Sequence, residues 1–154
     1  FCAVATDIID ETEAVFTDQV LSTDGNCYVT IPSAFSSSYY IVIKHRNSIA
    51  TWTSLPLLFD SNTVTYDFTT NVDKAYGDNL KEIASGIYAI YGGDVNQDGG
   101  IDSNDMGDID NDSFNLSTGY LLTDVNGDGG VDSNDMGIVD NNSFNLISVS
   151  VPTP

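Results

Sequence analysis

The stretch GDVNQDGGIDSNDMG at residues 93–107 is written a second time, as TDVNGDGGVDSNDMG at residues 123–137. Each copy places an Asp or Asn at nearly every second position around a Gly-Gly pair. When residues 94–116 are aligned on residues 124–146, 18 of 23 positions are identical. A repeat in a fixed register predicts two structural units of one kind, built by duplication.

Counted from its first aspartate, each copy has the spacing of a twelve-residue calcium loop. Such a loop uses oxygen ligands at positions 1, 3, 5, 9 and 12 and the backbone carbonyl at position 7, while glycine at position 6 permits a sharp turn. The expected ligands are Asp94, Asn96, Asp98, the carbonyl of Gly100, Asp102 and Asp105 in the first loop, and Asp124, Asn126, Asp128, the carbonyl of Gly130, Asp132 and Asp135 in the second. Four carboxylates per loop repel one another without a cation. The sequence therefore predicts two Ca²⁺ per chain, with Mg²⁺ the second choice because it prefers fewer protein ligands.

Two further positions of the loops carry expectations. Ile101 and Val131, at position 8, are expected to point inward and to let the paired loops exchange backbone hydrogen bonds. Position 12 is Asp where calcium sensors use a bidentate Glu, so coordination there is expected to be weaker. A solvated acidic turn is the alternative interpretation, and two copies in identical register speak against it.

The charge of the chain excludes several classes of partner. Its 154 residues carry a formal net charge of −19. The only basic residues are Lys44, Arg46, Lys74 and Lys81. Nucleic acids and anionic membrane surfaces need clustered Lys and Arg, so neither is an expected partner. No apolar run approaches the roughly 20 residues of a membrane span.

The part of the chain before the repeat has the pattern of short β-strands. Six stretches are rich in Val, Ile, Thr and Tyr and are separated by turn residues: AVFTDQVL, NCYVTI, YYIVIKH, IATWT, TVTYDF and GIYAIY. This spacing is typical of an antiparallel sandwich of the immunoglobulin-like class, which we expect over residues 1–91, with a hairpin turning at residues 46–48. Helical periodicity is weak and confined to residues 71–86. Residues 92–146 form the repeat domain, and residues 147–154 are expected to be a C-terminal strand or tail.

The duplicated DVNxDGxxDSxD loops resemble dockerin domains, the calcium-folded modules of exported bacterial proteins. With YYIVIKHRNSIATW, YDFTT, YGDN and GIYAIYGGDVNQDG, residues 38–146 resemble the sandwich-plus-dockerin-like modules of large surface proteins in Bacteroidetes-type bacteria. The resemblance implies a mainly β fold, an immunoglobulin-like sandwich followed by a small dockerin-like domain of two loops and short helices. It also implies a secreted or cell-surface location. The stretch SNDMGDIDNDSFNL departs from cellulosomal dockerins, whose longer exit helix carries basic residues that grip a cohesin.

The sequence does not indicate an enzyme. His45 is the only histidine, and no serine has the context of an activated nucleophile. We expect a non-enzymatic, extracellular calcium-binding structural protein, a self-assembling filament or adhesin subunit whose partners are copies of itself or another surface protein. Its alternating tails, FCAVATDII and LISVSVPTP, either complete their own sheet or pair across subunits. The alternatives are a docking module for a cohesin-like receptor and a carbohydrate-binding module, in which sugars would stack on Trp52, Tyr39, Tyr40, Tyr88 and Tyr91.

Cys2 and Cys27 are the only cysteines. In an oxidising compartment they are predicted to form a disulfide that ties down the N-terminal strand, and the alternative is two buried free thiols. The start at Phe1 fits a mature form from which an export signal has been removed.

Overall fold

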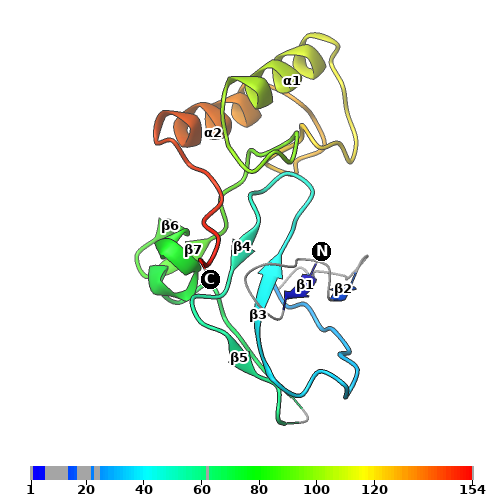
Figure 1. Cartoon of the computed structure of the whole chain (residues 1–154). Helices are drawn as coiled ribbons and strands as arrows, with labels where there is room; N and C mark the ends of the chain where they lie inside the picture. The colour runs from blue at the N-terminus through cyan, green and yellow to red at the C-terminus, as the bar shows by residue number, and fades with distance from the viewer. Residues whose placement is uncertain (1, 6–13, 17–21, 23–24, 62, 154) are drawn as a thin grey trace. The chain divides into compact units, whose positions relative to one another are not determined.

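A computed structural model describes residues 2–5, 14–16, 22, 25–61 and 63–153 (Figure 1). The chain divides into two units. The first, called here the sheet unit, comprises residues 1–44, 51–89 and 150–154. The second, the loop–helix unit, comprises residues 45–50 and 90–149. The short segment 45–50 therefore groups with the acidic repeat, although it lies between two strands of the sheet unit.

Antiparallel pairing of short strands organises the sheet unit. Its larger sheet has the order β2-β1-β3-β4, and β5 also pairs with β3. The strands are β1 (Cys2–Ala5), β2 (Ala14–Phe16), β3 (Ser38–Ile43), β4 (Thr51–Trp52) and β5 (Leu57–Leu58). The N-terminal strand β1 is central, because it pairs with β2 and along its whole length with β3, from Cys2 opposite Ile43 to Ala5 opposite Tyr40. The first part of the N-terminal tail thus completes a sheet within its own chain.

Large aromatic side chains fill the interior of the sheet unit. On β3 the buried residues are Tyr39 and Val42, and Trp52 of β4 is 2% exposed. The ring of Tyr39 makes edge-to-face contacts with Phe35 and Phe59, at centroid distances of 5.6 and 5.5 Å. Such pairs stabilise a core beyond the area they bury. Because Trp52 and Tyr39 are buried, they cannot belong to an exposed sugar-stacking platform.

Residues 71–86, where the sequence has weak helical periodicity, contain only two single helical turns. These are the 3₁₀ turns η1 (Val72–Lys74) and η2 (Tyr76–Asp78), and the strands β6 (Lys81–Ala84) and β7 (Ile87–Ala89) follow as a hairpin. A longer helix cannot form, because Gly77 (φ +68°) and Asp78 (φ +54°) have left-handed backbone conformations. The extended conformation predicted for the residues just before the first loop is confirmed by β7.

The structure confirms the coarse prediction for the fold, small antiparallel sheets together with short helices. The described strands do not by themselves define two stacked sheets, so the immunoglobulin-like sandwich stays a prediction. The predicted Cys2–Cys27 disulfide is not formed, since Cys27 is a free thiol on an exposed residue. Within the described residues, neither helix is long and apolar enough to cross a membrane.

Two helices of equal length form the frame of the loop–helix unit, α1 (Ser103–Phe114) and α2 (Ser133–Phe144). They pack against each other (Figure 1). Both are rich in Asp and Asn and contain a glycine, so their intrinsic helix propensity is low. Packing supports them, since Ile109 and Val139 are fully buried in a cluster of small aliphatic residues, Ile49, Val95, Ile101 and Val131.

Each helix is followed by a segment that pairs with the loop of the other copy. Beyond α1, Ser117 accepts a hydrogen bond from the N–H of Val131, at 3.1 Å. Beyond α2, Ile147 accepts one from the N–H of Ile101, at 3.0 Å. Ile101 and Val131 do point inward, as expected, but the expectation that the two loops bond to each other at position 8 is wrong. The segments that follow the two helices accept these hydrogen bonds instead. Ile147, the first residue of the predicted C-terminal tail, is one of the acceptors.

Candidate metal centre

The last third of each acidic loop is also the start of a helix. Asp102 and Asp132, at loop position 9, are the N-caps of α1 and α2, and each side chain accepts a hydrogen bond from the amide two residues on. Asp105 and Asp135, at position 12, complete a capping box by accepting from the N-cap amide. Acidic residues at a helix N-terminus are favoured by both the free amides and the helix dipole. The calcium-loop spacing and the helix-start signal therefore use the same four residues.

The aspartate at position 12 closes each loop. In the first loop, Oδ1 of Asp105 accepts hydrogen bonds from the N–H groups of Val95 (2.8 Å) and Asn96 (3.2 Å), and Oδ2 accepts from the N–H of Asp102 (2.9 Å). Asp135 makes the same three bonds in the second loop, to the amides of residues 125, 126 and 132. Both side chains are fully buried. An Asp is short enough to reach these amides, so it ties the first turn of the loop to its last.

Position 1 of the first loop holds a buried oxygen without a partner. Asp94 is 2% exposed, and its Oδ2 accepts a hydrogen bond from the N–H of Gly99 at 3.2 Å. Its Oδ1 is buried and accepts no hydrogen bond of ordinary geometry from the described residues, although the backbone N–H of Gln97 lies near enough to the carboxyl to lower its pKa slightly. Burial raises the pKa of Asp94 to about 6, and the nearby charge of Asp105 adds to the shift. An orphaned carboxylate oxygen in this position is what a cation would satisfy.

Position 1 of the second loop is surrounded differently. Oδ1 of Asp124 accepts a hydrogen bond from the N–H of Gly127 at 2.8 Å, so neither of its oxygens is orphaned. Its backbone carbonyl accepts from Nη2 of Arg46 and from Nδ2 of Asn47, both at 2.9 Å. Sequence reasoning placed residues 46–48 in a hairpin turn, which says nothing about what the turn packs against. These contacts to the second loop were missed.

The exposed turn of each loop has the geometry that the spacing predicts. Gly99 and Gly129, at position 6, both have φ +90°, a left-handed conformation that glycine adopts without strain. At positions 3 and 5, Asn96 accepts from the N–H of Asp98 at 2.8 Å and donates to its carboxylate at 3.0 Å, and the second loop repeats both bonds.

The donor set suits calcium, although the carboxylates do not converge. No three His, Cys, Asp or Glu side chains within the described ranges are arranged as a metal-binding group. The carboxylates at positions 1 and 12 instead accept hydrogen bonds from backbone amides of the loop. Two of the six ligands per loop, an Asn oxygen and a backbone carbonyl, are not acidic. The all-oxygen donors and the orphaned Oδ1 of Asp94 fit a hard divalent cation.

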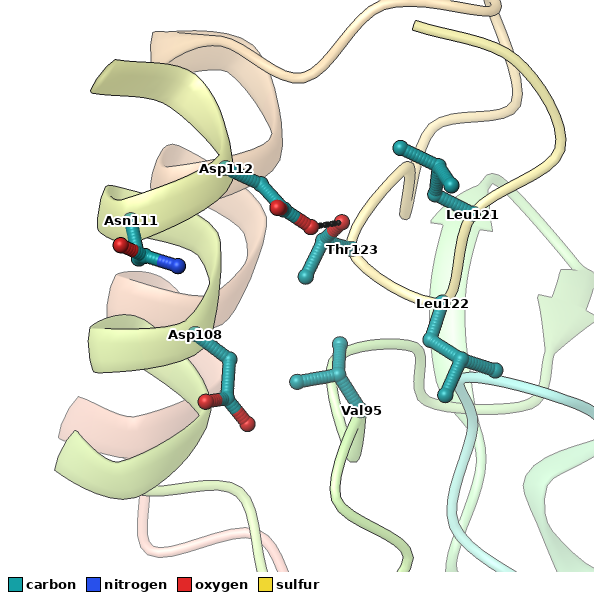
Figure 2. A pocket seen from close by; sticks show the side chains of 7 residues that line it. All are labelled: Val95, Asp108, Asn111, Asp112, Leu121, Leu122 and Thr123. Atoms are coloured by element: carbon teal, nitrogen blue, oxygen red, sulfur yellow. Dashed lines mark hydrogen bonds between the residues drawn. The ribbon is translucent and has the colours of Figure 1, made fainter. Parts of the chain in front are cut away.

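The loop–helix unit also has an open pocket of about 340 Å³ beside α1 (Figure 2). The hydroxyl of Thr123 donates to the carboxylate of Asp112 across it. The pocket is lined by Val95, Asp108, Asn111, Asp112, Leu121, Leu122 and Thr123. None of these is an expected calcium ligand, although Val95 is the second residue of the first loop.

Comparison with known proteins found no relative of this chain. No family model, no curated protein and no solved structure matches this chain. The predicted resemblance to dockerin-like modules therefore stays a prediction, and the function has to be argued from the two loops.

Proposed function

We propose that this chain is a non-enzymatic, secreted calcium-binding structural protein that holds one Ca²⁺ in each loop. The observation that carries the proposal is the orphaned, buried Oδ1 of Asp94 in a loop with calcium spacing. Bound calcium would supply positive charge that offsets the repulsion among the ligand carboxylates. The loop–helix unit contains twelve aspartates and one arginine, so this repulsion is large and a cation is the natural ligand.

The role proposed for this module is a subunit of a bacterial surface filament or adhesin, with an immunoglobulin-like sheet unit joined to a dockerin-like, calcium-stiffened unit. Strand pairing between subunits would use β1. Because β1 lies between β2 and β3, a neighbour's β1 could replace it in the same slot and link two chains. Calcium alone would lower the net charge of −19 by only four units. Association would therefore depend on main-chain pairing and apolar burial rather than on charge.

Calorimetry on chelator-stripped protein tests the calcium part. We expect two binding sites per chain, and the substitutions Asp98→Ala and Asp128→Ala should each remove one of them. Detection of no site, or of a site that survives both substitutions together, would contradict the proposal. Negative-stain imaging at high concentration with millimolar calcium tests the assembly part, and deletion of residues 1–9 should abolish any filaments.

A second candidate function, a docking module for a separate surface protein, rests on the ends of the two helices. Phe114 and Phe144 are both 86% exposed, and so much exposed aromatic surface stabilises no core. Each helix ends in a Schellman motif whose left-handed residue is not the usual glycine but an exposed leucine, Leu116 (φ +53°) or Leu146 (φ +54°). Both copies therefore present an exposed phenylalanine and an exposed leucine in a left-handed conformation at the end of the helix.

Imaging separates the two candidates, because a docking module should remain monomeric in the conditions that would give filaments. The double variant Phe114→Ser with Phe144→Ser sharpens the result. We expect its free energy of unfolding to stay within about 0.5 kcal/mol of the parent, as is usual for exposed positions. A larger loss would mean that these rings stabilise the fold and are not a docking surface.

A further inference from the structure

The two loops differ in the charge that surrounds their first ligand. In the second loop, Nη2 of Arg46 lies 3.9 Å from Oδ2 of Asp124 and donates to the Asp124 carbonyl. This is the only arginine or lysine of the loop–helix unit. Arg46 and Asp124 are both largely buried, with 14% and 3% of their side chains exposed, so water screens the pair only weakly. The first ligand of the second loop therefore already has a positive charge beside it.

The first loop has a neutral group in the corresponding place. The carbonyl of Asp94 accepts a hydrogen bond from Nε2 of Gln97, at 2.6 Å. Gln97 is aligned with Gly127, one of five differences between the copies, so the second loop has no side chain of its own for this role. Segment 45–50 supplies it instead, through Arg46 and Asn47. The positions are matched, but one carbonyl is held by an amide and the other by an amide and a guanidinium.

Arg46 is held firmly where it lies. Its guanidinium carbon is 4.1 Å from the centre of the Tyr120 ring, a cation–π distance. The neighbouring Asn47 accepts a hydrogen bond from the N–H of Gly93 at 2.7 Å, and Ile49 is buried in the core of the unit. Nε and Nη1 of Arg46 are buried and find no acceptor among the described residues.

We propose that Arg46 is a built-in counter-cation that makes the second loop the weaker calcium site, so that the first loop fills before it. This inference rests on the proposed calcium function. A calcium ion bound to Asp124 would be repelled by the nearby guanidinium of Arg46. The guanidinium would also partly neutralise the Asp124 carboxylate and so weaken its attraction for the ion. No basic side chain of the described residues contacts Asp94, and no hydrogen bond of ordinary geometry reaches its Oδ1. Arg46 is thus a positioning and affinity-setting residue, not a ligand.

The order of filling can be tested on the unaltered chain. Chelator-stripped protein receives one equivalent of calcium, and hydrogen exchange is followed at the amides of both loops. We expect protection to rise first at residues 94–105 and only with further calcium at residues 124–135. Filling of the second loop first, or of both loops in parallel, would overturn the proposal.

Two variants of Arg46 separate its charge from its hydrogen bond. Arg46→Gln keeps an amide donor and loses the charge, whereas Arg46→Lys keeps the charge. With the first loop disabled by Asp98→Ala, Arg46→Gln should tighten the remaining site about tenfold, which corresponds to about 1.4 kcal/mol. Arg46→Lys should change it by less than about threefold, since the charge is retained. With the second loop disabled by Asp128→Ala, neither variant should change the calcium affinity of the first loop by more than about twofold. Arg46 contacts Asp124 and not the ligands of the first loop, so the two sites should behave independently.

Each outcome has one meaning. An equal effect of Arg46→Gln on both loops, or equal effects of the two variants, would overturn the role given to Arg46. Two loops of equal affinity in the unaltered chain would do the same while leaving the calcium function intact. Absence of calcium binding by both single-loop variants would instead remove the proposed function itself. The exchange experiment needs no substitution, so a variant that failed to fold would not leave the question open.

Discussion

The sheet unit and the loop–helix unit bury different kinds of side chain. The sheet unit buries aromatic bulk, Trp52 and Tyr39, between strands whose main-chain groups pair with each other. The loop–helix unit has only Val and Ile fully buried in its apolar cluster, and it buries four aspartates as well, Asp94, Asp105, Asp124 and Asp135. Burial of an ionised carboxylate costs free energy unless hydrogen bonds or a cation compensate. Hydrogen bonds compensate most of these carboxylates, but Oδ1 of Asp94 has none. We therefore expect the first unit to be stable alone and the second to depend on its ligand.

The largest effect should come from removal of calcium. With excess EDTA we expect the amides of α1 and α2 to lose their protection from hydrogen exchange, because the small apolar cluster cannot by itself offset the entropy of ordering the chain. Amides of β3 and β4 should stay protected. Readdition of calcium should restore protection, and magnesium at the same concentration should restore less of it. Equal protection of both units in EDTA would mean that they do not differ in the way argued here.

The same experiment has a finer prediction at segment 45–50. Its residues lie between β3 and β4, yet the N–H of Ile49 donates to Tyr91 in the loop–helix unit. The N–H of Thr53, four residues on, donates to Ile41 within the sheet unit. In EDTA the Ile49 amide should therefore lose its protection from hydrogen exchange together with the amides of α1 and α2. The Thr53 amide should remain protected together with those of β3 and β4.

A substitution at position 12 should have the next largest effect. Asp105→Asn keeps the shape of the side chain but replaces one acceptor oxygen by a donor, so at least one of its three amide partners loses its acceptor. Hydrogen bonds to a charged acceptor contribute about 1.5–3 kcal/mol, so calcium affinity of the first loop should fall roughly 100-fold. Asp110→Asn, at an exposed position of the same helix, removes the same charge and is the matched control. A similar loss of affinity in both variants would attribute the effect to net charge, not to loop closure.

Local patterns predicted much of the loop–helix unit. The period of the repeat, the left-handed glycines at position 6 and the inward position 8 all follow from residue spacing, because each depends on neighbours within one loop. The coincidence of ligand positions 9 and 12 with a capping box was also readable, from Asp102 and Asp105 three residues apart at the start of α1. The same two residues match the calcium-loop spacing, so one sequence pattern carries both signals.

What could not be predicted depends on contacts between distant parts of the chain. Arg46 and Asp124 are 78 residues apart, and a polar hairpin turn gives no sign of the partner it will find. The pairing of each helix exit with the opposite loop is of the same kind, since it follows from how the two copies pack. In the sheet unit, the strand pattern correctly predicted β2, β3, β4 and β7, but the predicted residues 26–31 and 63–68 contain no strand, and β5 and β6 were not predicted. The short strands could be assembled in several ways. Only the central place of β1 between β2 and β3 establishes the strand order.

The smallest predicted effect concerns pH and tests whether the buried charge of the first loop behaves as argued. The pKa of Asp94 is raised from an ordinary 3.8 to about 6 by burial and by Asp105. A raised carboxyl pKa means that the metal-free fold prefers the protonated form. The metal-free loop–helix unit should thus become more stable as pH falls through about 6, while calcium, which needs the carboxylate, should bind less tightly.

Calorimetry across this range supplies the measurement. Calcium affinity of the first loop, isolated by Asp128→Ala, should be nearly constant above pH 6 and should fall about tenfold by pH 5, since each unit below the pKa costs up to a factor of ten. The control is Asp94→Asn, because it removes the carboxyl group to which the titration is assigned. That variant should bind more weakly at every pH and should lose the step near pH 6. A step of the same size in Asp94→Asn would assign the titration to another group, and the first loop would then lack the buried, poorly compensated charge that distinguishes its unit from the sheet.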